Sequence, residues 1–256
     1  MKLTHRNYFS KKAALEFMSV SQFKGFERCQ NSALAEIKGE YEREKTTSLL
    51  VGSYVDAFFE GSLEKFQKQN PEIYKKDGTL KAEYLQANTI IQRILKDKLF
   101  TSYMAGKKQV IMTGTICNVP VKIKIDSLHK DKIVDLKIMR DFENIRDEER
   151  GILPWWEFWG YDLQGAVYQE IVRQNTGQKL PFYLAAATKE KTTDIDIVHI
   201  DQQSLDLALD RFKHDVEMFD AIKKGIIEPE RCECCAYCKE TKILAKPRES
   251  EEFYFS

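Results

Sequence analysis

The chain has 256 residues, compatible with one large domain or two small ones, and its 43 % hydrophobic content is enough for an ordinary core. Forty basic and forty acidic side chains give a formal net charge of zero, which excludes a globally basic nucleic-acid-binding chain, so any such site must be local. No stretch approaches the ~20 apolar residues of a membrane span, and residues 1–17 lack the apolar core of a signal peptide, so we expect a cytoplasmic protein without a membrane partner.

The first part of the chain, to about residue 105, is predicted to be mainly helical. Serines placed for capping predict one helix over 19–38, and the segment 46–61 predicts a second helix that is apolar on almost every side and therefore buried. Residues 64–77 are polar, and a helical period returns over 80–98. We interpret this region as a surface excursion with one more helix and expect no chemistry there.

The second part predicts a sheet. β-Branched residues alternate with period two in three successive segments, which indicates a meander of strands. A helix, two further strands, a long helix and a cysteine cluster follow. The predicted strands are 110–115, 119–128, 132–138, 181–187 and 195–200, and the predicted helices are 161–174 and 203–224. This order predicts an α/β (α+β) fold with a central mixed sheet flanked by helices.

The segment from Val121 to Ile138 carries the most informative pattern. Side chains on a strand alternate between its two faces, so each of these strands has one apolar and one charged face. We expect both apolar faces to meet the same core. The apolar positions are Val121, Ile123 and Ile125 on the first strand and Val134, Leu136 and Ile138 on the second, and the charged faces carry Lys122, Lys124 and Asp126, then Asp135 and Lys137.

The register of this hairpin predicts a metal site. A turn centred between Lys130 and Asp131 places Asp126 opposite Asp135, with Cβ atoms about 4.5–5.5 Å apart. A solvated strand face also alternates charges outward, but an exposed hairpin would sooner pair opposite signs than like ones. Two carboxylates this close repel each other unless a cation lies between them, and oxygen ligands suit Mg²⁺ or Mn²⁺.

These residues resemble the motifs of the PD-(D/E)XK nuclease superfamily. An acidic residue ends one strand, Asp135-Leu136-Lys137 follows on the next, and a helix then carries Gln164 and Tyr168 at a spacing of four. The Gln-x-x-x-Tyr helix is similar to that of the RecB-like and exodeoxyribonuclease VIII-like (RecE-type) branch. Residues 18–40 and 50–61 also resemble phage and prophage members regarded as exonucleases.

The resemblance implies a restriction-endonuclease-like core within a single nuclease domain over residues 1–256, and it implies site residues. Asp56, Asp126 and Asp135 would hold Mg²⁺ or Mn²⁺, with the backbone carbonyl of Leu136 as a further ligand. Many RecB-like members have histidine or glutamate where this chain has Asp56, and an aspartate is also a ligand for a hard metal.

The same resemblance assigns catalytic roles to three further side chains. Lys137 would orient the attacking water and supply positive charge to the transition state. Gln164 and Tyr168 share one face of their helix and would position Lys137 or the scissile phosphate.

The cysteines form a second constellation. Cys232, Cys235 and Cys238 have the spacing C-x₂-C-x₂-C, which favours an iron–sulfur cluster or zinc in a reducing compartment. The resemblance implies that Cys29 closes a [4Fe–4S] site as the fourth ligand, with Zn²⁺ as the alternative. Cys234 is another candidate for that position, and Cys29 would then be a small buried side chain.

The sequence leaves three functions open. The leading prediction is a Mg²⁺-dependent DNA exonuclease that works in phage-type recombination, with DNA ends as substrate and a single-strand annealing protein or a second copy of the chain as partner. The second is an endonuclease or nickase of the same chemistry. The third is a non-catalytic nucleic-acid-binding module whose cysteine cluster is structural.

Overall fold

The structure is a computed structural model that describes residues 1–44, 46–244 and 247. The single domain over residues 1–256 stays a prediction, because its C-terminal end lies outside the described residues. Helices form most of the chain up to residue 103 and flank the strands that follow. The helices are α1 (Lys11–Glu16), α2 (Val20–Arg28), α3 (Gln30–Lys38), α4 (Thr47–Glu60), α5 (Leu63–Gln69), α6 (Ala82–Leu95), α7 (Lys98–Tyr103), α8 (Trp155–Phe158), α9 (Tyr161–Thr176), α10 (Gln202–Lys223) and α11 (Ala236–Glu240), with a 3₁₀ turn at Pro71–Ile73.

The strands form one five-stranded mixed sheet and a separate hairpin. The main sheet has the order β1-β2-β3-β6-β7, in which β3 and β6 are parallel and the other neighbours are antiparallel. The predicted fold class, a mixed sheet flanked by helices, is therefore confirmed. Its strands are β1 (Lys107–Ile116), β2 (Val119–Leu128), β3 (Ile133–Met139), β6 (Phe182–Thr188) and β7 (Ile195–Ile200), and the hairpin pairs β4 (Ile145–Asp147) with β5 (Gly151–Leu153).

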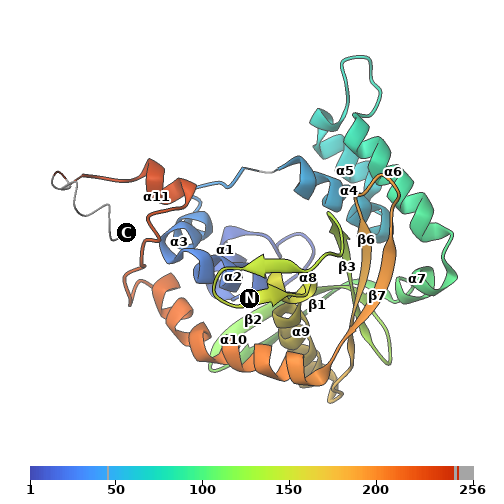
Figure 1. The fold of residues 1–256 in the computed structure, drawn as a ribbon. Coiled ribbons are helices and arrows are strands. Elements are labelled where there is room, and N and C mark those ends of the chain that lie inside the picture. The colour runs from blue at the N-terminus through green and yellow to red at the C-terminus, as the bar shows by residue number, and fades with distance from the viewer. Residues whose placement is uncertain (45, 245–246, 248–256) are drawn as a thin grey trace.

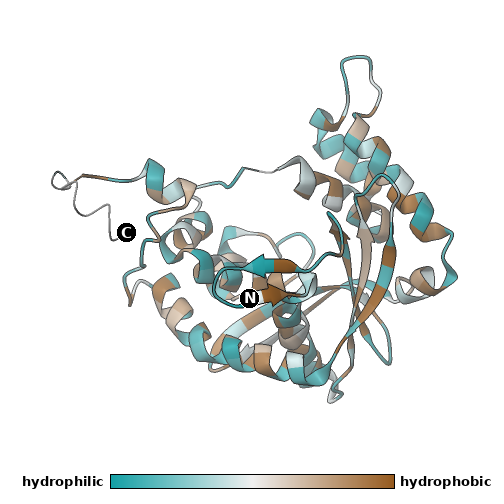
Figure 2. Ribbon diagram, in the orientation of Figure 1, coloured by the Kyte–Doolittle hydropathy of each residue, from teal (hydrophilic) through white to brown (hydrophobic). Residues whose placement is uncertain are grey.

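Helices cover both faces of the sheet (Figure 1). One core lies between the sheet and the group α2, α9 and α10, and a second lies between the sheet and the group α4, α6 and α7. Figure 2 shows hydrophobic colour along the central strands and mixed colours along α10, as expected for strands buried on both faces and a helix buried on one. Within the part of the chain that the structure describes, no helix combines the length and apolar character needed to cross a membrane.

Two sequence-based expectations about the helical part are wrong. The helix predicted over 19–38 is two helices, because Cys29 adopts an extended conformation with φ of −166° and caps the N-terminus of α3 with its sulfur. The polar segment 64–77 contains α5 and a 3₁₀ turn, because Leu63, Phe66 and Ile73 pack against the second core.

The hairpin register is as predicted, but its two apolar faces do not meet one core. Ser127 pairs with Val134, and the backbone N–H of His129 donates to the carbonyl of Lys132 at 2.9 Å. Both pairs have residue numbers that sum to 261, as the predicted turn requires. The apolar residues of β2, however, belong to the core under α9, whereas Val134 and Leu136 belong to the core under α4. The strands separate beyond Ser127, so each packs its apolar side chains against a different set of helices.

One glycine allows α9 to lie close to the sheet. A Cβ atom on Gly165 would come within 2.4 Å of the Phe182 ring of β6. Because the hydrogen of glycine leaves that space free, the neighbouring Gln164 is brought within hydrogen-bonding reach of β3. The close helix–sheet contact thus positions a polar side chain at the strand that carries Asp135.

Candidate active site

A cavity of about 440 Å³ opens where β2 and β3 separate. The paired part of the two strands ends at Ser127 and Val134, and the next residues toward the cavity are Asp126 and Asp135. Helix α4 contributes Asp56 and Glu60 to the lining of the cavity, and residues of α2 and α9 also line it. The cavity therefore gathers carboxylates from three elements that lie far apart in the sequence.

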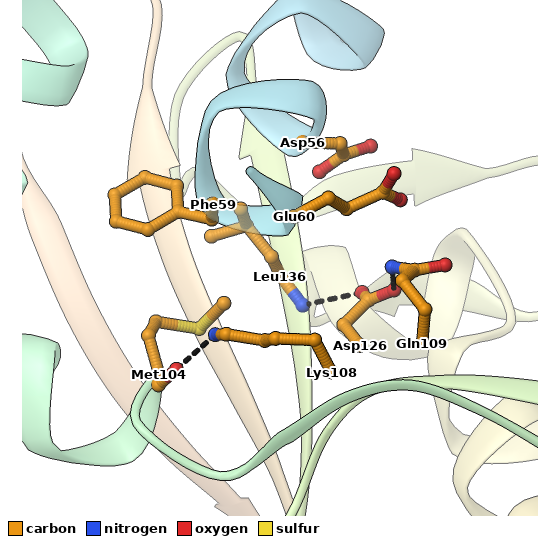
Figure 3. A pocket seen from close by; sticks show the side chains of 8 residues that line it. All are labelled: Asp56, Phe59, Glu60, Met104, Lys108, Gln109, Asp126 and Leu136. Atoms are coloured by element: carbon orange, nitrogen blue, oxygen red, sulfur yellow. Dashed lines mark hydrogen bonds between the residues drawn. The ribbon is translucent and has the colours of Figure 1, made fainter. Parts of the chain in front are cut away.

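Asp126 is held by two hydrogen bonds. The backbone N–H of Leu136 donates to its Oδ2 at 3.0 Å, and Gln109 Nε2 donates to its Oδ1 at 3.2 Å (Figure 3). Gln109 has a left-handed backbone with φ of 52° and lies opposite Asp126 between two regular pairs of the β1–β2 ladder. Burial, followed by the nearby carboxylate of Asp135, raises the pKa of Asp126 to about 7. The protein therefore holds this aspartate firmly in surroundings that disfavour its charge.

Asp135 and Lys137 form a buried ion pair on β3. Asp135 is 2 % exposed, and its Oδ2 faces the Lys137 ammonium. The Lys137 Nζ also lies 4.6 Å from the centre of the Tyr161 ring. Burial alone would lower the pKa of Lys137, but Asp135 and further anionic neighbours outweigh it, so the net shift is upward and the side chain stays a cation.

Asp56 and Glu60 lie one turn apart on α4 and both line the cavity. Figure 3, a close view of the adjoining smaller pocket, shows both side chains on the side of α4 that faces Asp126. Burial, followed by repulsion from Asp126, raises the pKa of Asp56 well above its ordinary value. Glu60 Oε1 lies 3.9 Å from the Nζ of Lys124. The helix thus adds a half-buried carboxylate next to the two on the strands.

The donor set fits a hard divalent cation. Burial and neighbouring carboxylates raise the pKa of both aspartates, with Asp135 acting on Asp126 and Asp126 acting on Asp56, and a bound cation would reverse these shifts. Gln109 Oε1 is buried and accepts no hydrogen bond from the residues that the structure describes, whereas the buried Asp135 Oδ2 is paired with the Lys137 ammonium. Buried oxygens without donors carry a desolvation penalty that a metal ion or its water ligands would offset.

Gln164 and Tyr168 project from α9 toward the two strands. Gln164 Nε2 donates to Asp135 Oδ1 at 2.6 Å, and the Tyr168 hydroxyl donates to the backbone carbonyl of Lys124 at 3.0 Å. Both side chains line the cavity, as does Leu136. In this arrangement Gln164 contacts an aspartate and Tyr168 contacts the backbone of β2.

Several residues in or next to the cavity were not predicted from the sequence. Lys24 on α2 donates to the carbonyls of Trp159 and Gly160 at 2.8 and 3.3 Å, and burial, followed by the Lys137 charge, lowers its pKa to about 8. Glu60 follows Asp56 by four residues, a helical spacing that could have indicated it. Gln109 and Lys24 had no comparable signal, because their partners lie 17 residues away and more than 130 residues away respectively.

The structure brings four cysteines together at a second site. The sulfurs of Cys29, Cys232, Cys235 and Cys238 all lie within 4.8 Å of one another. Cys234 is exposed and lies outside this group. Backbone N–H groups of the cysteine loop lower the pKa of Cys232 to about 6, so its thiolate is accessible at neutral pH. Four sulfur donors fit zinc or an iron–sulfur cluster.

The chain matches a known family over most of its length. A family model described as a PDDEXK-like domain of unknown function (DUF3799) matches residues 19–241. The chain belongs to this family. The predicted PD-(D/E)XK resemblance is therefore confirmed.

A solved structure agrees with the PDDEXK-like assignment. The chain is similar to a protein from Eubacterium rectale that is described as a "putative exonuclease", with 46 % sequence identity and a TM-score of 0.96. The similarity covers 99 % of this chain and 98 % of the other. A comparison with curated proteins finds no match. Family and structural likeness together support a nuclease.

Proposed function

We propose that this protein is a metal-dependent DNA exonuclease that hydrolyses phosphodiester bonds. The observation that carries the proposal is the cavity in which Asp56, Asp126 and Asp135, from three separate elements, meet the half-buried cation of Lys137. The PDDEXK-like family and the description of the Eubacterium rectale protein support it.

The metal in this proposal is Mg²⁺ or Mn²⁺, held by Asp56, Asp126 and Asp135 and by the backbone carbonyl of Leu136. A divalent ion bound there polarises a phosphoryl oxygen and lowers the pKa of a water molecule. The chain's own residues keep these ligands in place. Gln164 fixes Asp135 through one carboxylate oxygen, the other faces the Lys137 ammonium, and Leu136 N–H fixes Asp126.

Lys137 supplies the positive charge that phosphodiester hydrolysis requires. It is a half-buried cation beside Asp135, so its ammonium orients a water molecule and stabilises negative charge that develops on the phosphate. Tyr168 acts at a distance from the reacting atoms. Its hydroxyl holds the Lys124 carbonyl, which keeps β2 in place beside the cavity.

The test is cleavage of linear and closed circular DNA in Mg²⁺, Mn²⁺ and EDTA. An exonuclease degrades end-labelled linear DNA in the two metals, spares closed circles and is inactive in EDTA. Cleavage of closed circles would favour the endonuclease or nickase alternative. Binding without turnover in either metal would favour the non-catalytic module and overturn the proposal.

We further propose that the cysteine group holds a single Zn²⁺ ion in preference to a [4Fe–4S] cluster. Four thiolates at about 2.3 Å from one tetrahedral ion place their sulfurs about 3.8 Å apart. The Cys29–Cys238 and Cys232–Cys238 sulfurs lie 3.5 and 4.0 Å apart, on either side of that value. Metal analysis of protein purified without oxygen decides between the two, because stoichiometric iron with sulfide would refute the zinc assignment.

A further inference from the structure

The ring of Phe9 is exposed at the proposed active site. Its exposed fraction is 79 %, although it lies in the walls of two cavities of about 440 and 790 Å³. The two cavities share Phe9, Asp56, Glu60 and Lys124 as lining residues, so Phe9 lies where they meet beside the aspartates. An aromatic ring left open to water among charged groups has a large apolar surface available for a ligand.

The backbone that carries Phe9 is firmly anchored. The neighbouring Tyr8 is 7 % exposed, and its carbonyl accepts a hydrogen bond from Lys122 Nζ at 2.7 Å. The same ammonium lies 4.7 Å from the centre of the Tyr8 ring, and the Tyr8 and Phe9 rings meet edge to face at 4.9 Å. These contacts hold the backbone at Phe9 in place next to the cavity, so the Phe9 ring stays exposed at that position.

A cation lies beside the exposed ring. Lys124 Nζ is 5.0 Å from the centre of the Phe9 ring, and the backbone of Lys124 is held by Tyr168. Lys124 and Asp126 are two residues apart on β2 and line the same cavity. The site thus combines an apolar face and a positive charge, which match the base and the phosphate of one nucleotide.

We propose that Phe9 and Lys124 form a subsite for an unpaired nucleotide next to the scissile phosphate, so the substrate is single-stranded DNA or a frayed end. The inference rests on the proposed nuclease function. A base within a duplex has both faces covered by its neighbours, whereas an unpaired base is free to stack on an aromatic side chain. Duplex DNA would have to open at its end to place a base on Phe9.

The test is binding of single-stranded oligonucleotides in Ca²⁺, by fluorescence anisotropy, with one abasic position moved stepwise along the strand. We expect wild-type affinity to fall about tenfold when the abasic position reaches the subsite. Phe9→Ala should bind the intact strand about tenfold more weakly and show no such positional loss. Phe9→Trp should retain it. Leu207→Ala, which removes an exposed apolar side chain of α10, should behave as wild type.

The outcomes separate this subsite from the proposed enzyme activity. A positional loss of equal size in Phe9→Ala, or no positional loss in the wild type, would overturn the subsite even if the protein cleaves DNA. A positional loss that depends on Phe9, in a protein that cleaves no DNA in Mg²⁺ or Mn²⁺, would support the subsite and refute the nuclease function. Thermal unfolding of each variant checks that folding is unchanged.

Discussion

Substitutions at the Asp135–Lys137 pair should affect the stability of the protein and its catalytic rate in different ways. Asp135 is buried and Lys137 is half-buried, with side-chain exposures of 2 % and 17 %, so Lys137→Met leaves a buried carboxylate without its cation. Removal of one partner from a buried pair costs about 3–5 kcal/mol. We expect Lys137→Met to lose about 3 kcal/mol of unfolding free energy in EDTA. The double variant Asp135→Asn/Lys137→Met, which has neither charge, should recover most of that loss.

Turnover should not recover in the double variant. The loss of a preorganised charge at the transition state lowers kcat by about 10²- to 10³-fold. We therefore expect Lys137→Met to be slow at saturating Mg²⁺, and the double variant to be no faster because it also lacks a metal ligand.

The assays are urea unfolding in EDTA and cleavage of end-labelled linear DNA in Mg²⁺. Lys191→Met is the matched control, because Lys191 is exposed and lines none of the cavities described above. Wild-type cleavage by Lys137→Met, with contaminating nuclease excluded, would refute the catalytic role of Lys137. Additive stability losses in the double variant would refute the energetic coupling of the pair.

Three further predictions test the surrounding structure. Gln164→Leu removes the 2.6 Å hydrogen bond to Asp135, so the free energy of unfolding should fall by about 1–3 kcal/mol. The variant should change kcat more than it changes KM, and unchanged kinetics would contradict the positioning role. Cys29→Ser should lower both the bound metal per chain and the melting temperature, whereas Cys234→Ser, outside the cysteine group, should change neither; metal analysis and calorimetry check this. Lys223 is buried, and burial lowers its pKa to about 8, so between about pH 8 and 10 the unfolded chain binds more protons than the folded chain. The stability of the wild type relative to Lys223→Met should therefore rise with pH over that window, and a flat difference in urea unfolding would contradict the assignment.

The β2–β3 hairpin was the part of the site that could best be predicted from the sequence. A two-residue loop and strict alternation fix the register of the paired residues, so the pairing of Ser127 with Val134 followed from counting residues, whereas Asp126 and Asp135, predicted to lie directly opposite each other, lie beyond the last pair of the ladder. Alternation failed beyond the paired segment. Ile125 packs under α9, whereas Ser127 donates to the Tyr103 carbonyl near the other core. A period-two pattern assumes a continuous ladder and does not indicate where two strands separate.

Contacts between segments that are distant in the sequence were harder to predict. The resemblance indicated Asp56, but nothing in the local sequence indicated that Lys24 would lie in the same cavity. Cys29 was expected inside a continuous helix, yet its extended backbone is what turns its sulfur toward Cys238, 209 residues away. Local helix propensity favours one continuous helix through Cys29. The structure instead has a break between α2 and α3 at Cys29, where its sulfur contacts the other cysteines.

The separation of β2 from β3 is itself the feature that creates the site. Where β3 departs, the backbone of Met18 takes its place beside β2: Met18 N–H donates to the Pro120 carbonyl at 2.8 Å, and Lys122 N–H donates to the Met18 carbonyl at 2.9 Å. The N–H of Leu136 on β3 is instead satisfied by the side chain of Asp126. A buried N–H without a partner would be costly, so the same carboxylate that we propose as a metal ligand also stabilises the open end of the hairpin. The N-terminal segment that fills the gap carries Tyr8 and Phe9 to the edge of the cavity, which explains why an aromatic side chain from the first ten residues lies beside aspartates from the centre of the chain.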